Sequence, residues 1–237
     1  MKPVAIFRHS PTEGPGYFAT YLDSRHLPWR LVALDRGEPV PTRTTDFSGL
    51  VFMGGPMSVN DDLPWIAPVL ELIRRAVTDD LPVLGHCLGG QLMSKALGGS
   101  VGRNPVKEIG WGEIEVADNS LARLWFGADL TRFESFHWHG ESFTIPPGGV
   151  RIMGNRNCEN QGFVVGKNLG MQCHVEMTEQ LIDSWCESGA DEIAGNRASP
   201  AVQSAEQMKS RMEEKIAAMR RIADRLYDNW VKGLQRT

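Results

Sequence analysis

The stretch Gly85-His86-Cys87-Leu88-Gly89-Gly90-Gln91 constrains the fold of this chain more than any other. The apolar run 81–84 before it has the length of a buried strand. After it, residues repeat at helical spacing as far as Leu97, and Gly98-Gly99 supplies a stop signal. Cys87 therefore lies at a strand-to-helix turn with a glycine two positions away on each side. This G-x-C-x-G pattern is typical of a nucleophile elbow in which sulfur replaces the usual oxygen.

Two physical effects favour Cys87 as a nucleophile. A turn this tight pushes the side chain out of the sheet top, and a side chain at Gly85 or Gly89 would crowd the neighbouring backbone. The unpaired N–H groups and the dipole at the start of a helix also favour a thiolate. The alternative is a small buried cysteine in a glycine-rich turn, which is a common environment for a free cysteine.

The first hundred residues alternate between strand-like and helix-like segments, a pattern that indicates βαβ units and a parallel sheet. Ligands of such sheets bind beyond the carboxyl ends of the strands, where Cys87 and the turn Gly54-Gly55-Pro56 would both lie. The expected strands are Val4–Phe7, Leu31–Leu34, Leu50–Met53 and Leu81–Leu84, and the expected helices before the elbow are Tyr17–Leu27 and Trp65–Val77.

After Gly99 the pattern changes to short strands separated by turns, which predicts antiparallel strands that extend the sheet. Gly189–Ala201 is polar and loop-like, and Ala205–Val231 is predicted as one long C-terminal helix packed on the rest of the chain. We expect a single domain over residues 1–237. The further strands expected are Val101–Arg103, Ile109–Val116, Thr131–His137, Val150–Asn155, Gly162–Val165 and Leu169–Val175, with helices at Leu121–Phe126 and Glu179–Ser188.

Composition excludes several classes of protein. The net charge is −4 with no dominant basic stripe, which argues against a nucleic-acid partner. No apolar run approaches the roughly 18 residues of a membrane span, and the N-terminus leads directly into a strand rather than a signal peptide. The four cysteines form no CxxC pair and suit a reducing compartment. We therefore expect a cytoplasmic protein.

A cysteine nucleophile needs a base, and the base needs a group that orients it. Among the six histidines, His174 is favoured because Glu176 follows two places later. Side chains two apart in an extended strand project from the same face, so the carboxylate can reach the imidazole, fix its tautomer and stabilise the imidazolium.

Four segments together resemble the class I, triad-type glutamine amidotransferases. They are the elbow 85–91 with Leu97-Gly98-Gly99, the run Gln172-Cys173-His174-Val175-Glu176, the turn Met53-Gly54-Gly55-Pro56, and Trp138-His139-Gly140-Glu141 ahead of Pro146-Pro147-Gly148. They occur in the order of that family and spread over residues 51 to 176. The resemblance implies a flavodoxin-like α/β three-layer sandwich with a central, mostly parallel sheet, which agrees with the strand pattern.

The resemblance also implies a role for each matching residue. Cys87 would attack the side-chain carbonyl of a γ-glutamyl substrate, His174 would act as base and then acid, and Glu176 would orient His174. The N–H groups of Gly55 and Leu88 would bind the oxyanion. Further residues would contact the substrate or lie near its pocket: Gln91, Trp138 and His139.

Several alternatives remain open. His137 and His139 would share one face of a strand as a metal-binding pair, but no further ligand pair has recognisable spacing, so we expect neither a metal nor another cofactor. Nucleotide-binding motifs are absent. Within the family, the chain could release ammonia for a synthetase on a separate chain, act alone as a γ-glutamyl peptidase, or be a non-catalytic binding protein. A homodimer is also compatible with the sequence.

Overall fold

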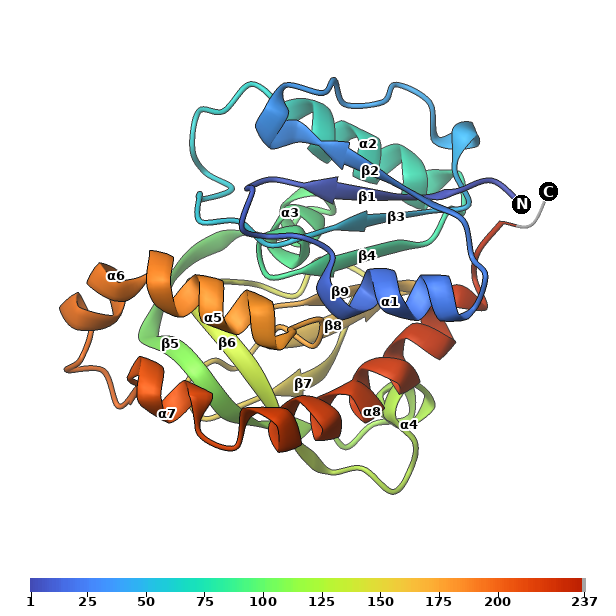
Figure 1. Ribbon diagram of the computed structural model, residues 1–237. Helices are drawn as coiled ribbons and strands as arrows, with labels where there is room; N and C mark the ends of the chain where they lie inside the picture. Colours follow the sequence, from blue (N-terminus) through green and yellow to red (C-terminus); the bar gives the residue numbers. More distant parts are fainter. Residues whose placement is uncertain (236–237) are drawn as a thin grey trace.

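The computed structural model describes residues 1–235 and contains one mixed ten-stranded sheet with helices on both faces (Figure 1). The strands run in the order β10-β5-β7-β8-β9-β4-β3-β1-β2, and β6 pairs with β5. Parallel pairing joins β2, β1, β3, β4 and β9 in one half, whereas β5, β6, β7, β8 and β9 pair antiparallel in the other. The expected α/β sandwich with antiparallel extension strands is therefore present.

Element bounds follow the apolar runs closely in the first half of the chain. The strands are β1 Val4–Arg8, β2 Trp29–Ala33, β3 Gly49–Phe52, β4 Val83–His86, β5 Val101–Val116, β6 Arg132–Phe143, β7 Val150–Gly154, β8 Gly162–Val165, β9 Asn168–Met171 and β10 Ala201–Val202. The helices are α1 Gly16–Ser24, α2 Ile66–Thr78, α3 Leu88–Ala96, α4 Ser120–Phe126, α5 Glu179–Ser188, α6 Ala190–Gly195, α7 Ala205–Lys209 and α8 Met212–Val231. Two short 3₁₀ turns cover Leu34–Arg36 and Thr44–Asp46.

Two apolar layers enclose the sheet, because successive strand residues face opposite sides. Val4 and Ile6 of β1 face the layer formed by α1, α4, α5 and α8, whereas Ala5 and Phe7 face the layer formed by α2 and α3. Figure 1 shows α8 running along one face of the sheet, far from α2. Among residues 1–235, no helix combines the length and apolar character that crossing a bilayer requires.

The C-terminal helix expected over Ala205–Val231 is interrupted, so that prediction was wrong in one respect. Ser210 has extended backbone and Arg211 is left-handed, with φ +53°, which separates α7 from α8. The break turns α7 toward β5, where the indole N–H of Trp111 donates to the carbonyl of Met208 at 2.8 Å. A tertiary contact thus overrides a continuous helical pattern.

Three further segments differ from expectation. Gly189–Ala201 contains α6 rather than only loop, and β5 joins the two strands expected at Val101–Arg103 and Ile109–Val116 through an irregular register. The strand expected at Leu169–Val175 ends at Met171. Beyond it, His174 makes an isolated antiparallel bridge to Phe136 of β6, because the chain leaves β4 and crosses toward the antiparallel half.

Candidate active site

The turn between β4 and α3 holds Cys87 in a strained backbone conformation. Its φ is +49° and its ψ −106°, a region that non-glycine residues occupy rarely and that is concentrated at functional sites. The N–H of Cys87 donates to the carbonyl of Met171 at 2.8 Å, which fixes the turn against β9. A Cβ at Gly89 would overlap the carbonyl of Phe52, and a Cβ at Gly85 would overlap the backbone of Gly89. The elbow therefore depends on its glycines.

His174 and Glu176 form a buried, directly hydrogen-bonded pair. The imidazole Nδ1 lies 2.6 Å from Oε1 of the carboxylate. The backbone of His174 is held on both sides, because its N–H donates to Phe136 and its carbonyl accepts from the hydroxyl of Ser135. The strand ends before this pair, so the bridge to β6 and not a continuous strand fixes the imidazole.

The charges of this pair are strongly coupled. Burial opposes ionisation of Glu176, but the imidazoles of His86 and His174 beside it lower its pKa to about 2. Burial would lower the pKa of His174, yet the charges of Glu176 and Cys87 raise it well above its ordinary value. The arrangement favours a carboxylate beside an imidazolium, with the Cys87 thiol as the further partner of the ring.

Behind the pair, His86 and Tyr227 complete a buried polar chain. The Nε2 atom of His86 lies 3.1 Å from the hydroxyl of Tyr227 and 3.8 Å from Oε2 of Glu176. The ring of His86 is completely buried, and burial lowers its pKa. This chain reaches from α8 through the sheet to the imidazole and restrains Glu176 from behind.

One cavity of about 500 Å³ brings most of the predicted site residues together. Leu88 is the first residue of α3, so its N–H is among those that have no acceptor within the helix. A Cβ at Gly55 would lie 2.8 Å from the Leu88 side chain, which places the two predicted oxyanion donors side by side. The predicted residues that line the cavity are Gly55, Cys87, Gln91, Trp138, His139 and His174.

The turn after β3 is supported by His9, which the sequence predicts as an ordinary surface or loop residue. It lies in a loop but is 3% exposed, and its Nδ1 is 3.1 Å from the carbonyl of Met53. Burial lowers the pKa of His9 to about 4, so the ring is neutral and can donate one hydrogen bond. The ring also packs on Trp65, with centroids 4.9 Å apart. His9 thus orients the backbone ahead of Gly55.

Gln91 and Trp138 are both held by hydrogen bonds at the cavity wall. The amide of Gln91 donates to Oε1 of Gln172 at 3.2 Å, and the amide of Gln172 lies 3.5 Å from Sγ of Cys87. The indole N–H of Trp138 donates to Glu192 of α6 at 2.7 Å. Helix α6, which the sequence analysis interprets as loop, therefore fixes one wall of the cavity.

Four cavity residues were not predicted: Glu13, Lys107, Trp185 and Glu192. Glu13 lies beside His174, and burial raises the pKa of its carboxyl to about 7. Its place after β1, at the carboxyl edge of the parallel strands, is a signal that could have identified it. Lys107 forms an ion pair with Glu192. These two come from an irregular part of β5 and from α6, where the sequence carries no comparable signal.

Comparison with known proteins places this site in a family. The sequence model described as "Glutamine amidotransferase class-I" matches residues 19–185. The glutamine amidotransferase-like protein YfeJ of Salmonella typhimurium is 28% identical over 221 residues, covering 88% of this chain and 91% of that protein. One of the separate subunits of the glutamine-hydrolysing GMP synthase of Sulfurisphaera tokodaii is 30% identical over 166 residues, covering 68% and 85% respectively. The crystal structure of a glutamine amido transferase from Methylobacillus flagellatus superposes with a TM-score of 0.97 at 43% identity, over 100% of this chain and 97% of that one.

Proposed function

This chain belongs to the class I glutamine amidotransferase family, and we propose that it hydrolyses γ-glutamyl amides through a thioester on Cys87. The observation that carries the proposal is the convergence of Cys87 and His174 on one cavity, with Glu176 hydrogen-bonded to the imidazole. Segments distant in sequence supply these groups. A binding protein of the same fold would have no need of a strained cysteine beside an ionised His–Glu pair.

The proposed reaction has two half-steps. Sγ of Cys87 forms a bond to the amide carbon, and the oxyanion of the tetrahedral intermediate is stabilised by the N–H groups of Gly55 and Leu88. When the C–N bond breaks, His174 protonates the leaving amine or ammonia. Water then attacks the thioester, giving its proton to His174 and releasing glutamate and the free thiol. Glu176 remains ionised throughout.

Two roles for this reaction remain distinct. The Sulfurisphaera relative is by its name one component of a synthase made of separate chains, which supports release of ammonia for a synthetase partner. The second candidate is a stand-alone γ-glutamyl peptidase. It is favoured by the cavity of about 500 Å³, which is within the range of sites for drug-sized ligands and exceeds the needs of one amino acid.

Kinetics of variants test the chemistry. We expect Cys87→Ala to lower kcat at least about 10⁴-fold, His174→Ala to do comparable damage, and Glu176→Gln to do less. Cys186→Ala is the matched control, since Cys186 is buried in α5 away from the cavity. Mass spectrometry after incubation with a glutamine-like electrophile should find the adduct on Cys87 alone. Retained activity in Cys87→Ala, or an adduct on another cysteine, would overturn the proposal.

Substrate comparison separates the two roles. The isolated chain is assayed with glutamine and with γ-glutamyl dipeptides, and kcat/KM is compared. Efficient dipeptide cleavage with poor glutamine turnover supports the peptidase. Glutamine turnover that rises only when a synthetase chain is added supports the ammonia-releasing role.

A further inference from the structure

A second cluster of reactive side chains lies behind the wall of the Cys87 cavity. Glu108 of β5 stands opposite His139 of β6 in the antiparallel register, and His137 lies two residues before His139. The three side chains each offer one donor atom, and these atoms lie within 4.8 Å of one another. All three residues are buried, with exposed fractions of 2%, 1% and 4% for Glu108, His137 and His139. Their chemistry, two imidazoles and one carboxylate, is a common donor set for divalent transition metals.

The orientation of His139 suits a metal ligand. Its Nδ1 lies 3.1 Å from the carbonyl of Glu141, so this nitrogen carries the proton and donates it. Its Nε2 then presents a lone pair to Oε2 of Glu108 at 3.0 Å. A lone pair and a carboxylate oxygen attract each other only with a cation between them, either a proton or a metal ion. Metal-binding histidines are commonly oriented in this way, through a backbone carbonyl on the other ring nitrogen.

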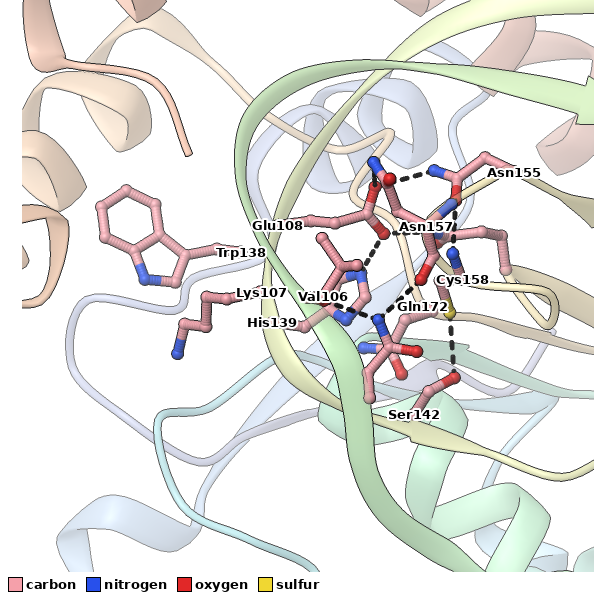
Figure 2. A network of polar contacts seen from close by, with 12 residues as sticks. Val106, Lys107, Glu108, Trp138, His139, Ser142, Asn155, Asn157, Cys158 and Gln172 are labelled. Atoms are coloured by element: carbon pink, nitrogen blue, oxygen red, sulfur yellow. Dashed lines mark hydrogen bonds and ion pairs between the residues drawn. The ribbon is translucent and has the colours of Figure 1, made fainter. Parts of the chain in front are cut away.

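The carboxylate of Glu108 is held in place by three amide side chains (Figure 2). Asn155 and Asn157 donate to Oε1 at 2.8 and 3.2 Å, and Gln161 donates to Oε2 at 2.7 Å. Burial opposes its ionisation, but the hydrogen bond from His139 and the nearby imidazoles lower the pKa of Glu108 to about 2. Glu108 is therefore an oriented, ionised carboxylate, as a metal ligand must be.

His137 supplies an independent observation. Within residues 1–235, neither ring nitrogen of His137 has a hydrogen-bond partner, although the residue is buried. Unpaired buried polar groups are costly and rare in folded proteins. Burial lowers the pKa of His137 to about 4, so the ring is neutral and a lone pair is free to coordinate. A polar group in this condition points to a missing partner.

The cluster has a route to solvent and room beside it. Glu108 and Gly112 line a second cavity of about 480 Å³ on the far side of the wall, whereas His139 lines the Cys87 cavity. A Cβ at Gly112 would lie 2.9 Å from Cδ2 of His137, so the glycine leaves space for that ring. A cation can thus reach the cluster without passing Cys87.

We propose that Glu108, His137 and His139 bind one divalent first-row transition-metal ion, with Zn²⁺ as the first choice, and leave at least one position to water. The site is separate from the Cys87 chemistry, and no step of the proposed reaction depends on it. Because His139 lines the Cys87 cavity, the ion would fix part of the cavity wall. The sequence concealed this site because Glu108 lies 29 residues before His137, next to an irregular register in β5.

The test uses the full-length chain carrying Cys87→Ser, so that the thiol of the proposed active site cannot compete for metal. The protein is equilibrated with Zn²⁺, dialysed against metal-free buffer and analysed for bound zinc, and Co²⁺ replaces Zn²⁺ for visible spectroscopy. We expect one equivalent of zinc, Co²⁺ bands typical of imidazole and carboxylate ligands, and a higher Tm with added Zn²⁺. In the same background, His137→Gln and Glu108→Gln should lower the Zn²⁺ affinity at least about 100-fold.

His26→Gln is the matched control, because His26 is exposed in the loop after α1 and should leave zinc binding unchanged. Should Glu108→Gln fail to fold, His137→Gln decides the matter, with the Tm of the metal-free protein as its check on folding. Absence of stoichiometric zinc overturns the proposal. So does zinc that survives His137→Gln, or zinc that is lost on His174→Gln instead.

Discussion

The conformation of Cys87 links strain, packing and reactivity at the scale of one residue. A left-handed φ costs an ordinary residue about 1–3 kcal/mol and persists only where neighbouring contacts hold it. Here those contacts are backbone to backbone, since Gly85 packs against Gly89 and Gly90 packs against Met171. The elbow therefore derives its shape from the absence of side chains around it. The thiol reaches the cavity because three glycines give way.

Gly89→Ala should destabilise the protein by about 3 kcal/mol or more. Alanine normally stabilises a helix relative to glycine, but here its Cβ would overlap the carbonyl of Phe52 in the neighbouring strand. The free energy of unfolding in urea measures the effect. The matched control is Gly102→Ala in β5, where an added Cβ has nothing within 4 Å and the change should stay within about 1 kcal/mol. Equal effects at the two positions would contradict the packing argument.

Glu13 should make stability depend on pH. Its pKa rises from 4.5 to about 7 on folding because the carboxyl is buried, so the folded state binds the proton more tightly. The contribution of Glu13 to stability is therefore greatest below pH 4.5, falls as the pH rises from 4.5 to 7, and is constant above. Over that range it amounts to at most about 3 kcal/mol.

Glu13→Gln removes this dependence, so the variant should gain stability relative to the unchanged protein between about pH 5 and pH 8. Urea unfolding at the two pH values measures the gain. Glu206→Gln, at an exposed position before the break in the C-terminal helices, is the control and should show no such change. A pH-independent difference for Glu13→Gln would show that folding leaves the proton affinity of this carboxyl unchanged.

At the scale of elements, helix α4 depends on side chains from α8 for its C-terminal end. The last carbonyls of a helix lack partners within the helix. The amide of Asn229 donates to the carbonyls of Leu124 and Trp125 at 3.1 and 3.0 Å, and Arg225 donates to that of Phe126 at 2.6 Å. A short helix of seven residues is thus completed by another element.

Asn229→Ala should lower the free energy of unfolding by about 1–2 kcal/mol, because it leaves two carbonyls of α4 without a donor. Chemical denaturation gives the value. Arg221→Ala, at an exposed position on the same helix, keeps a helix-forming residue there and should change stability by less than about 0.5 kcal/mol. A loss equal to that of the control would mean that water replaces the amide at no cost.

The elements that the sequence predicts well are those whose own residues decide them. The elbow at Cys87 and the strands β1, β3 and β4 follow from glycine spacing and from apolar runs buried on both faces. The end of β9 at Met171, the break at Ser210–Arg211 and helix α6 depend on contacts with β6, Trp111 and Trp138. Such contacts between distant segments leave no periodic signal in the sequence.

The same distinction applies to the site. His174 and Glu176 are neighbours in the sequence, and the elbow identifies its own cysteine, so both could be predicted together with the resemblance. Glu13 and Lys107 could not, because their proximity to the cavity arises only when β1, β5 and α6 are assembled. Burial is what gives Glu13 its raised pKa, and burial at a loop is not legible from residue types.

At the scale of the whole molecule, one sheet joins two apolar layers that have no other common element. Leu72 of α2 lies in one layer and Leu226 of α8 in the other, and both side chains are buried. Strands such as β1 contribute alternate residues to both layers, so neither layer can lose its packing without exposing the sheet. We propose that residues 1–235 unfold as one cooperative unit.

Leu72→Ala and Leu226→Ala test this proposal from opposite faces. Each should cost about 2–5 kcal/mol through the cavity it leaves. In a cooperative molecule, either substitution lowers the midpoint of a single urea transition, followed alike by far-ultraviolet circular dichroism and by tryptophan fluorescence. Two separated transitions, or a substitution that shifts one probe and not the other, would mean that each layer holds its half of the sheet independently. The elbow argues against that outcome, because Gly85 and Gly89 lock β4 and α3 together while Cys87 is bonded to β9.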